Sequence, residues 1–434
     1  MFELPESPLQ KAILVQIYFP EKKGSFLSVN RFLEFKDLAV SSGAKISYED
    51  QGKQKRPTAG LFISKGRAQR IKDLVQEFDS DLVIFNHDLS PSQERNLESL
   101  LQTRVLDRTG LILDIFASRA KSHVGKLQVE LAQLSHLSTK LIRGWSHLER
   151  QKGGIGLRGP GETQLETDRR LINQRIKNIK NKLKKSHKQR AINRYSRNKS
   201  DQTLVALVGY TNAGKTTLFN RLTNNNQYIA NKPFTTLDSV TRRNAISGLD
   251  GILFSDTVGF ISDLPTHLVE SFRATLDELK YADLLIHVID ISDPDYHFKI
   301  SQVAKILEKL RISHIKQIKV NNKCDKTEIK DFRDLSSSTK GEVWISAENN
   351  IGIEELKKAV NFYSENIRKE VWIKMDTSLG NIRSKLYSLS RVIEERTTDS
   401  GLIQLHLEIG EKELNNLLST KGIQLDNTII KETI

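Results

Sequence analysis

The stretch 203–222 restricts most strongly the fold that this chain can adopt. Its centre, residues 209–216 (GYTNAGKT), fits the pattern G-x-x-x-x-G-K-[ST]. A β-branched apolar run precedes the motif, and the residues after it read as the first turns of a helix. A strand, a glycine loop and a helix N-terminus together surround polyphosphate oxygens with backbone N–H groups. The stretch therefore predicts a phosphate-binding loop on an α/β sheet.

Two side chains of this loop have predicted roles in nucleotide binding. Lys215 would reach the β- and γ-phosphates of a nucleotide, and the Thr216 hydroxyl would ligate Mg²⁺. A glycine-containing turn that matches by chance is the alternative, which the flanking strand and helix disfavour. The other residues expected to hold the nucleotide are Gly209, Tyr210, Thr211, Asn212, Ala213, Gly214 and Thr217.

Composition limits the class of protein. The length of 434 residues suggests two to four domains, and the net charge of +14 favours an anionic partner such as nucleic acid. A single cysteine, Cys324, excludes an internal disulfide and a cysteine-clustered zinc site, and we interpret it as a packing residue. No apolar run reaches the ~18–20 residues of a membrane span, and the N-terminus lacks signal-peptide features. We expect a cytoplasmic monomer without a membrane span, with peripheral attachment of part of it to a membrane left open.

Residues 1–115 are predicted to form a small α/β unit with a mostly parallel sheet. Ser90 is expected to cap a helix that has Pro91 at its first position. We interpret His87 as a solvated loop residue rather than a ligand. The expected strands are 12–18, 60–63 and 81–85, the other expected helices are 28–39 and 68–78, and the segments 104–107 and 111–115 close the unit.

Residues 116–200 are predicted to form a long antiparallel helical hairpin. Leucines from Leu127 to Leu141 recur at seam spacing, and so do the apolar residues from Leu165 to Leu183. The glycine-rich loop 144–161 separates the two patterns and would form the tip. At 1.5 Å per residue, that tip lies on the order of 40–50 Å from the phosphate loop.

The second helix of this hairpin is strongly basic. Between Arg169 and Lys199 there are thirteen Lys and Arg residues and no Asp or Glu. A solvated helix face usually mixes charge signs, so we interpret the basic segment 163–199 as a contact for nucleic-acid phosphates. Tyr195 is the one aromatic residue between Arg169 and Lys199, which favours recognition of backbone and shape over base stacking.

Residues 201–366 are predicted to form a doubly wound nucleotide domain, and residues 367–434 a small α+β domain that serves for contact. The strands expected in the first are 203–208, 240–247, 251–255, 284–290, 315–320 and 342–345, with helices at 265–280, 296–310 and 352–366. The last domain is expected to contain strands 371–375 and 402–409 and helices 379–390 and 411–419.

Short motifs after the predicted strands indicate how the nucleotide is held. Asp256 follows one strand and is expected to hold Mg²⁺, while the backbone N–H of Gly259 would sense a γ-phosphate. Thr235 and Thr236 lie between the first helix of this domain and the predicted strand 240–247, where a threonine can close onto Mg²⁺ when the γ-phosphate is present.

A second group of motifs indicates the base. Asn322, Lys323 and Asp325 follow the strand 315–320, and the Asp325 carboxylate can accept both N–H donors of the guanine N1 and N2 edge. Adenine lacks this pair of donors, so the site predicts GTP or GDP as the ligand. Ser346 and Ala347 are expected near the base.

These motifs resemble those of the translation-factor-related GTPases, and longer blocks resemble the HflX family. The blocks are GLRGPGETQLETDRR at 156–170, DRTGLILDIFA at 107–117, LQVELA at 127–132 and DTVGFI at 256–261. The resemblance implies a ribosome-associated GTPase that binds the large ribosomal subunit and splits or rescues stalled or idle ribosomes, notably under stress. It also assigns the magnesium role to Thr236 rather than Thr235. Ser239 and Glu348 depart from the family, which usually has Pro and Lys there.

Phe260 stands where many GTPases have a glutamine that orients the attacking water. Phenylalanine cannot hydrogen-bond to water, so we expect slow intrinsic hydrolysis that the ribosome accelerates, with hydrolysis acting as the release switch. Two alternatives remain open at this point. The chain can be a GTP-dependent ribosome-binding regulator without significant turnover, or an RNA remodeller that hydrolyses ATP at a second site.

Overall fold

The chain divides into two compact units in its computed structural model. The first comprises Met1–Ser186, Tyr228–Asp238 and Val258–Leu276, and the second comprises His187–Gln227, Ser239–Thr257 and Asp277–Ile434. No helix in the part of the chain that the structure describes is long and apolar enough to cross a membrane. The described residues are 10–20, 29–151, 160–198, 202–225, 233–234, 236, 240–244, 249, 251–261, 276–327, 341–365, 368–398, 401–410 and 423–425.

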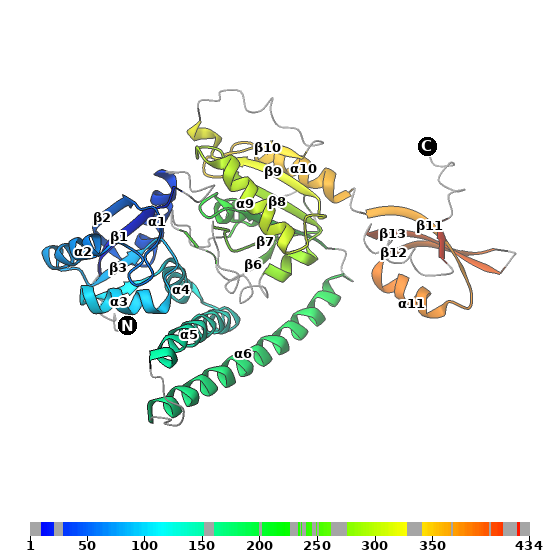
Figure 1. The fold of residues 1–434 in the computed structure, drawn as a ribbon. Coiled ribbons are helices and arrows are strands. Elements are labelled where there is room, and N and C mark those ends of the chain that lie inside the picture. The colour runs from blue at the N-terminus through cyan, green and yellow to red at the C-terminus, as the bar shows by residue number, and fades with distance from the viewer. Residues whose placement is uncertain are drawn as a thin grey trace, which may run out of the picture. The chain divides into compact units, whose positions relative to one another are not determined.

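A four-stranded parallel sheet forms the centre of the first unit, with strand order β2-β1-β3-β4 (Figure 1). Strand β3 reads LVIF and is buried along its whole length, as expected for a strand covered on both faces. The predicted α/β unit with a mostly parallel sheet is therefore confirmed. The strands are β1 (Lys11–Tyr18), β2 (Lys45–Lys53), β3 (Leu82–Phe85) and β4 (Arg104–Leu106), and the helices are α1 (Val29–Ser41), α2 (Lys65–Phe78), α3 (Pro91–Leu101) and α4 (Arg108–Arg119).

Strand β2 is absent from the sequence-based expectations, and three further details of this unit differ from them. Residues 60–63 form a tight turn closed by the Thr58–Phe62 bridge rather than a strand, and the segment 111–115 lies within α4. His87 is not a solvated loop residue. Its ring accepts a hydrogen bond from the Ile17 N–H at 3.1 Å and packs 5.0 Å from the Phe62 ring centroid, so it helps to fill the carboxyl end of the sheet.

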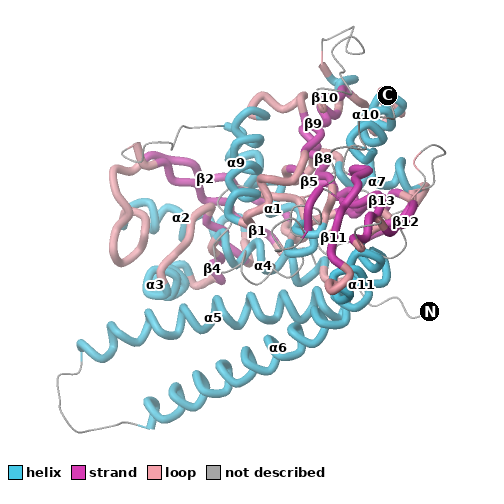
Figure 2. Tube along the Cα trace, turned by 90° about the vertical axis from the view of Figure 1, so that its right-hand side faces the viewer, coloured by secondary structure: helices cyan, strands magenta, loops and turns pink. Residues whose placement is uncertain are grey.

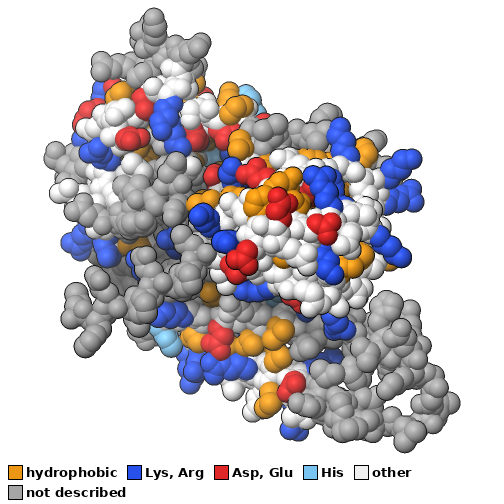
Figure 3. Space-filling model, turned by 90° about the vertical axis from the view of Figure 1, so that its left-hand side faces the viewer, with side chains coloured by type: hydrophobic (Ala, Val, Ile, Leu, Met, Phe, Trp, Pro, Cys, Tyr) orange, Lys and Arg blue, Asp and Glu red, His pale blue; other side chains and the backbone are white. Residues whose placement is uncertain are grey.

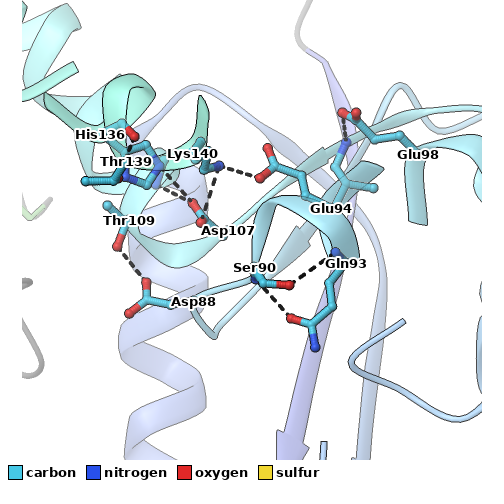
Figure 4. Close-up of polar contacts among 12 residues, drawn as sticks. Asp88, Ser90, Gln93, Glu94, Glu98, Asp107, Thr109, His136, Thr139 and Lys140 are labelled. Atoms are coloured by element: carbon cyan, nitrogen blue, oxygen red, sulfur yellow. Dashed lines mark hydrogen bonds and ion pairs between the residues drawn. The ribbon is translucent and has the colours of Figure 1, made fainter. Parts of the chain in front are cut away.

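The start of α3 agrees with its predicted cap. Ser90 Oγ accepts from the Gln93 N–H at 3.3 Å, and the Gln93 side chain accepts from the Ser90 N–H at 2.9 Å (Figure 4). Pro91 occupies the first helical position, where its missing N–H costs nothing. This reciprocal capping box fixes the beginning of α3.

The helical hairpin consists of α5 (His123–Gln151) and α6 (Pro160–Asn198), which run side by side in Figure 2. Leu127, Leu131, Ile179 and Leu183 form a buried cluster between them, at the predicted seam positions. Helix α5 continues to Gln151, so the predicted tip loop 144–161 is partly helical. Its central residues, 152–159, lie outside the described residues.

Helix α5 is anchored on the parallel sheet through Asp107 (Figure 4). This carboxylate caps α4 by accepting from the Gly110 N–H at 2.7 Å, and it lies 3.5 Å from Lys140 Nζ of α5. Lys140 also pairs with Glu94 of α3, and burial raises the pKa of the Glu94 carboxyl. One buried carboxylate thus joins the end of β4, the start of α4 and the first helix of the hairpin.

A six-stranded sheet forms the core of the second unit, in the order β10-β9-β8-β5-β7-β6. All neighbouring strands are parallel except β6, which runs antiparallel to β7. This order confirms the predicted P-loop sheet. The strands are β5 (Thr203–Gly209), β6 (Val240–Arg243), β7 (Ile252–Asp256), β8 (Leu284–Asp290), β9 (Gln317–Asn322) and β10 (Glu342–Trp344), and the helices are α7 (Lys215–Thr223), α9 (Tyr296–Lys309) and α10 (Ile353–Glu365).

The C-terminal part of the chain forms an antiparallel sheet with strand order β12-β13-β11-β14, and helix α11 (Gly380–Leu389) packs on its apolar side. Strands β12 and β14 are absent from the sequence-based expectations. The helix expected at 411–419 and most of that expected at 265–280 lie outside the described residues, and a 3₁₀ turn occupies Asp277–Tyr281. The strands are β11 (Arg368–Asp376), β12 (Arg391–Thr397), β13 (Leu402–Gly410) and β14 (Ile423–Leu425).

Candidate nucleotide-binding site

The loop between β5 and α7 has a backbone that depends on two glycines. Gly209 and Gly214 have φ angles of 151° and 93°, which side-chain-bearing residues rarely adopt. A Cβ atom at Gly209 would overlap the Val288 carbonyl oxygen, and one at Gly214 would overlap the Asn322 side-chain amide. Both glycines of the motif are therefore required by close packing as well as by conformation.

Lys215 is already aimed at this loop. Its ammonium group donates to the carbonyl oxygens of Gly209 at 3.1 Å and Tyr210 at 2.7 Å, and the residue is 6% exposed. Burial lowers the pKa of Lys215 to about 8, although the Asp256 carboxylate acts in the opposite direction. The site thus holds a desolvated cation where polyphosphate oxygens would supply compensating charge.

Thr216 and Asp256 bring two hard oxygen groups together. The Thr216 hydroxyl donates to Asp256 Oδ2 at 2.8 Å, and Asp256 is fully buried at the end of β7, next to β5. Oxygen donors of this kind suit Mg²⁺, which is bound in nucleotide sites by one or two protein groups together with phosphate oxygens. No group of three or more His, Cys, Asp or Glu residues poised for a metal occurs among the described residues.

The predicted base-recognition residues lie at the carboxyl ends of β9 and β10. The Asn322 amide donates to the Ala213 carbonyl of the phosphate loop at 2.8 Å, and its oxygen accepts from the Ala347 N–H at 3.0 Å. Lys323 Nζ lies 2.6 Å from the Asp290 carboxylate, and Asp325 is exposed. The second unit therefore brings three predicted motifs together at the carboxyl ends of its parallel strands, as expected for a doubly wound sheet.

The other residues of the predicted phosphate loop differ in how far they are exposed. Tyr210, Thr211 and Ala213 are buried, Thr217 is half-buried in the first turn of α7, and Asn212 is exposed. Ser346 is fully buried, and its hydroxyl accepts from the Asn349 N–H at 3.1 Å.

Thr236, Gly259 and Phe260 belong to segments of the first unit, so their roles stay predictions. Phe260 is 2% exposed. Two residues before Thr236, the Phe234 ring packs edge-to-face on Phe116 of α4, with centroids 4.6 Å apart. Thr235 lies outside the described residues.

Sequence reasoning missed three side chains around this site. Arg221 of α7 donates to two carbonyl groups after β10, and Asp290 pairs with Lys323. Lys299 of α9 lies 4.9 Å from the centroid of the Tyr210 ring. An isolated Arg, Asp or Lys carries no sequence signal for such a contact, because each contact joins distant segments.

A basic surface accompanies the hairpin. From Arg169 to Lys185, α6 carries eight Lys and Arg residues and no Asp or Glu, and all eight are exposed. Arg175 pairs with Glu130 of α5 at 2.6 Å, which ties the base of the hairpin together. Elsewhere the visible surface carries Lys and Arg together with Asp and Glu (Figure 3).

Comparison with known proteins decides the family. Three family models match in succession: the N-terminal region of GTP-binding GTPases over residues 30–117, the middle region over 119–197 and a 50S ribosome-binding GTPase over 204–323. GTPase HflX of Escherichia coli (strain K12) is 45% identical over 427 residues, which cover 97% of this chain and 98% of that protein. The chain belongs to the HflX family. The resemblance stated from the sequence blocks is thereby confirmed.

Other HflX relatives span most of the same length. GTPase HflX of Caldanaerobacter subterraneus subsp. tengcongensis is 44% identical over 351 residues, covering 81% of this chain and 80% of that protein. Among solved structures, a GTP-binding protein from Sulfolobus solfataricus in complex with GDP is 23% identical, with a TM-score of 0.45, and covers 82% of this chain and 99% of its own. As an HflX GTPase, the chain binds GTP and GDP and hydrolyses GTP to GDP and phosphate.

Proposed function

We propose that this HflX GTPase binds the large ribosomal subunit in its GTP form, splits or rescues stalled or idle ribosomes, and leaves after hydrolysis. The observation that carries the proposal is the exposed surface of α6, where eight cations occur without one carboxylate between Arg169 and Lys185. Such a surface gains free energy by releasing counterions from nucleic-acid phosphates. The family description "50S ribosome-binding GTPase", matched over 204–323, supports ribosomal RNA as the partner.

The hairpin suits a partner that is recognised by shape. Its first helix is fixed to the parallel sheet by the Lys140–Asp107 contact, and the two helices share a buried seam. A rigid arm can carry the basic segment 163–199 and the loop 144–161 into a structured RNA without a large loss of conformational entropy. We expect backbone contacts rather than sequence reading there.

Magnesium is part of the proposed site. Thr216 and Asp256 would hold the ion together with nucleotide phosphates, and Thr236 would join when a γ-phosphate is present. The hydroxyl and carboxylate oxygens of Thr216 and Asp256 already face each other, which fits a hard divalent cation. When bound, the ion would neutralise charge on the phosphates, and Lys215 and the Gly259 N–H would stabilise the transferred γ-phosphoryl group.

We propose that the ribosome compensates for the missing water-orienting side chain of this GTPase. The Phe260 side chain has no hydrogen-bonding group, so the residue after Gly259 cannot orient water as a glutamine does. We therefore expect slow hydrolysis by the free protein and acceleration on the large subunit. The protein would act as a monomer in the cytoplasm.

Sedimentation of ribosomes with the purified protein tests this function. With a non-hydrolysable GTP analogue, we expect intact ribosomes to be lost and the protein to migrate with large subunits. With GTP, the subunits should separate and the protein should return to the top fractions. Lys215→Ala, which cannot hold the phosphates, is the matched control and should leave ribosomes intact.

Two results would contradict the proposal. If ribosomes stay intact while the ribosome-bound protein releases no significant phosphate from GTP, the chain is a regulator without turnover rather than a splitting factor. If ATP replaces GTP in every step and Asp325→Asn has no effect, the chain is an ATP-driven RNA remodeller.

A further inference from the structure

The last turn of α7 contacts the loop that is expected to face the guanine base. Arg221 Nε donates to the Ala347 carbonyl at 3.1 Å, and Arg221 Nη2 donates to the Glu348 carbonyl at 2.7 Å. One planar guanidinium group therefore holds two successive carbonyls of the loop 346–348. Arginine can make both bonds at once because its donors form a rigid fork.

Both backbone polar groups of Ala347, its N–H and its carbonyl, are hydrogen-bonded to side chains. Its N–H donates to Asn322 Oδ1 at 3.0 Å, while its carbonyl accepts from Arg221. Asn322 in turn donates to the Ala213 carbonyl at 2.8 Å. The contacts form a closed ring that starts at Ala213, passes through Asn322, Ala347 and Arg221, and returns along α7 to the phosphate loop.

The beginning of the loop is fixed without Arg221. Ser346 is fully buried, bridges to Ile351 and accepts from the Asn349 N–H. The carbonyl groups of Ala347 and Glu348, by contrast, accept from Arg221. Removing the guanidinium group should therefore loosen these two residues while the sheet and the Ser346 turn stay in place.

We propose that Arg221 is a positioning residue for guanine recognition: it holds the loop 346–348 so that the Glu348 N–H can donate to the keto oxygen of the base, since the N–H groups of Ser346 and Ala347 already donate to Ile351 and Asn322. This inference rests on the proposed base site formed by Asn322, Asp325, Ser346 and Ala347. The donor must be fixed, because a keto oxygen accepts from an N–H group whereas the 6-amino group of adenine does not.

Helix α7 gives this contact a second consequence. The helix begins at Lys215, which lies on the phosphate loop, and carries Arg221 six residues later in its last turn. The phosphate end and the base end of the site are therefore positioned by one short, rigid element. Loss of Arg221 should affect the base end alone, because Lys215 and Thr216 keep their own partners.

Nucleotide affinity of Arg221→Ala tests the inference. We expect its Kd for GDP to rise about 5- to 10-fold through faster dissociation, as befits the loss of two partly exposed hydrogen bonds from a charged donor. The Kd for ADP, which cannot use the loop donor, should stay within about twofold. Arg221→Lys, which can reach one carbonyl at a time, should fall between wild type and Arg221→Ala.

Two controls separate a positioning role from a general loss of structure. Lys309→Ala removes an exposed cation from α9 of the same unit and should leave both affinities unchanged. Single-turnover hydrolysis at saturating GTP should keep its rate in Arg221→Ala, because the phosphate end is intact. An unchanged Kd for GDP would overturn the inference, and so would an equal weakening of GDP and ADP.

Asp325→Asn distinguishes failure of this inference from failure of the base site itself. If Asp325→Asn lowers the preference for GDP over ADP and Arg221→Ala does not, the role of Arg221 alone is wrong. If neither variant changes that preference, the assignment of the base site is wrong as well.

Discussion

The Thr216 hydroxyl donates to Asp256 Oδ2 across 2.8 Å, so a helix start and a strand end meet at one point of the site. Both groups carry hard oxygen atoms of the kind that suit a divalent cation. Their contact brings the phosphate motif and the Asp256 motif together although forty residues separate them in sequence.

Asp256→Asn should raise the Mg²⁺ concentration needed for half-maximal GTP hydrolysis by at least about tenfold, since a neutral amide is a weaker ligand for a hard cation than a carboxylate. Titration of Mg²⁺ in single-turnover assays measures this shift. GDP binding in EDTA serves as the control, because it needs no ion, and should change by less than about threefold. An unchanged Mg²⁺ midpoint would argue against Asp256 as a ligand.

Lys215→Met should stabilise the empty protein at pH 7. Burial lowers the pKa of Lys215 from 10.5 to about 8, so keeping it charged in the fold costs on the order of 3 kcal/mol. Methionine removes the charge and fills similar space, although it loses the bonds to Gly209 and Tyr210. The midpoint of urea unfolding without nucleotide measures the difference, and Lys309→Met is the exposed control.

The pH dependence of this difference has a defined sign. Below about pH 8 the folded and unfolded chains both hold the Lys215 proton, and the full cost is present. Between about 8 and 10.5 the folded chain releases the proton that the unfolded chain keeps, so wild-type stability rises with pH. The advantage of Lys215→Met should therefore shrink over that window. His287 adds no charge at pH 7, since burial lowers its pKa to about 4. An advantage that grows with pH would be incompatible with this account.

Asp325→Asn should reduce the preference for GTP over ATP by about 100-fold, because two hydrogen bonds to a charged acceptor are weakened. Xanthine carries a carbonyl where guanine carries its 2-amino group, and the asparagine amide can donate to it. The variant should therefore gain affinity for XTP, which a misfolded protein would not. Competition binding with the three nucleotides measures both changes, and retention of full GTP selectivity would remove Asp325 from the base site.

Replacing Lys180, Lys182 and Lys184 by Gln should weaken binding to large ribosomal subunits without changing GTP affinity. The slope of log affinity against log salt should become shallower by about 2–3, since three phosphate contacts are lost. Lys305, Lys309 and Lys358, which are exposed in the second unit, provide a triple Gln control of equal charge. Equal losses in both triple variants would show that net charge, rather than the hairpin, governs binding.

Local patterns explain which parts of the fold could be predicted. The phosphate loop and the Ser90 cap are short contiguous motifs whose chemistry is complete within a few residues, and both appear as expected. Strand β2 reads KISYEDQGK and lies at the edge of its sheet, so it lacks the apolar run that marks buried strands. Residues 60–63 are apolar, yet Phe62 adopts a positive φ of 63°, which ends any strand there.

Contacts between distant segments explain what could not be predicted. The fork between Arg221 and the carbonyls of Ala347 and Glu348 joins residues about 126 positions apart. His87 looked solvated because its sequence neighbours are polar, but the fold places it against Phe62 and β1. Residue spacing carries no information on such pairs until the sheet order is known.

Single-turnover GTP hydrolysis with and without purified large ribosomal subunits tests the central claim most directly. The account predicts a slow rate for the free protein, because Phe260 cannot orient water, and an acceleration of at least about 100-fold when large subunits are added. The triple Gln variant of Lys180, Lys182 and Lys184 should need a higher concentration of subunits for the same rate. Equal rates with and without large subunits would contradict the account.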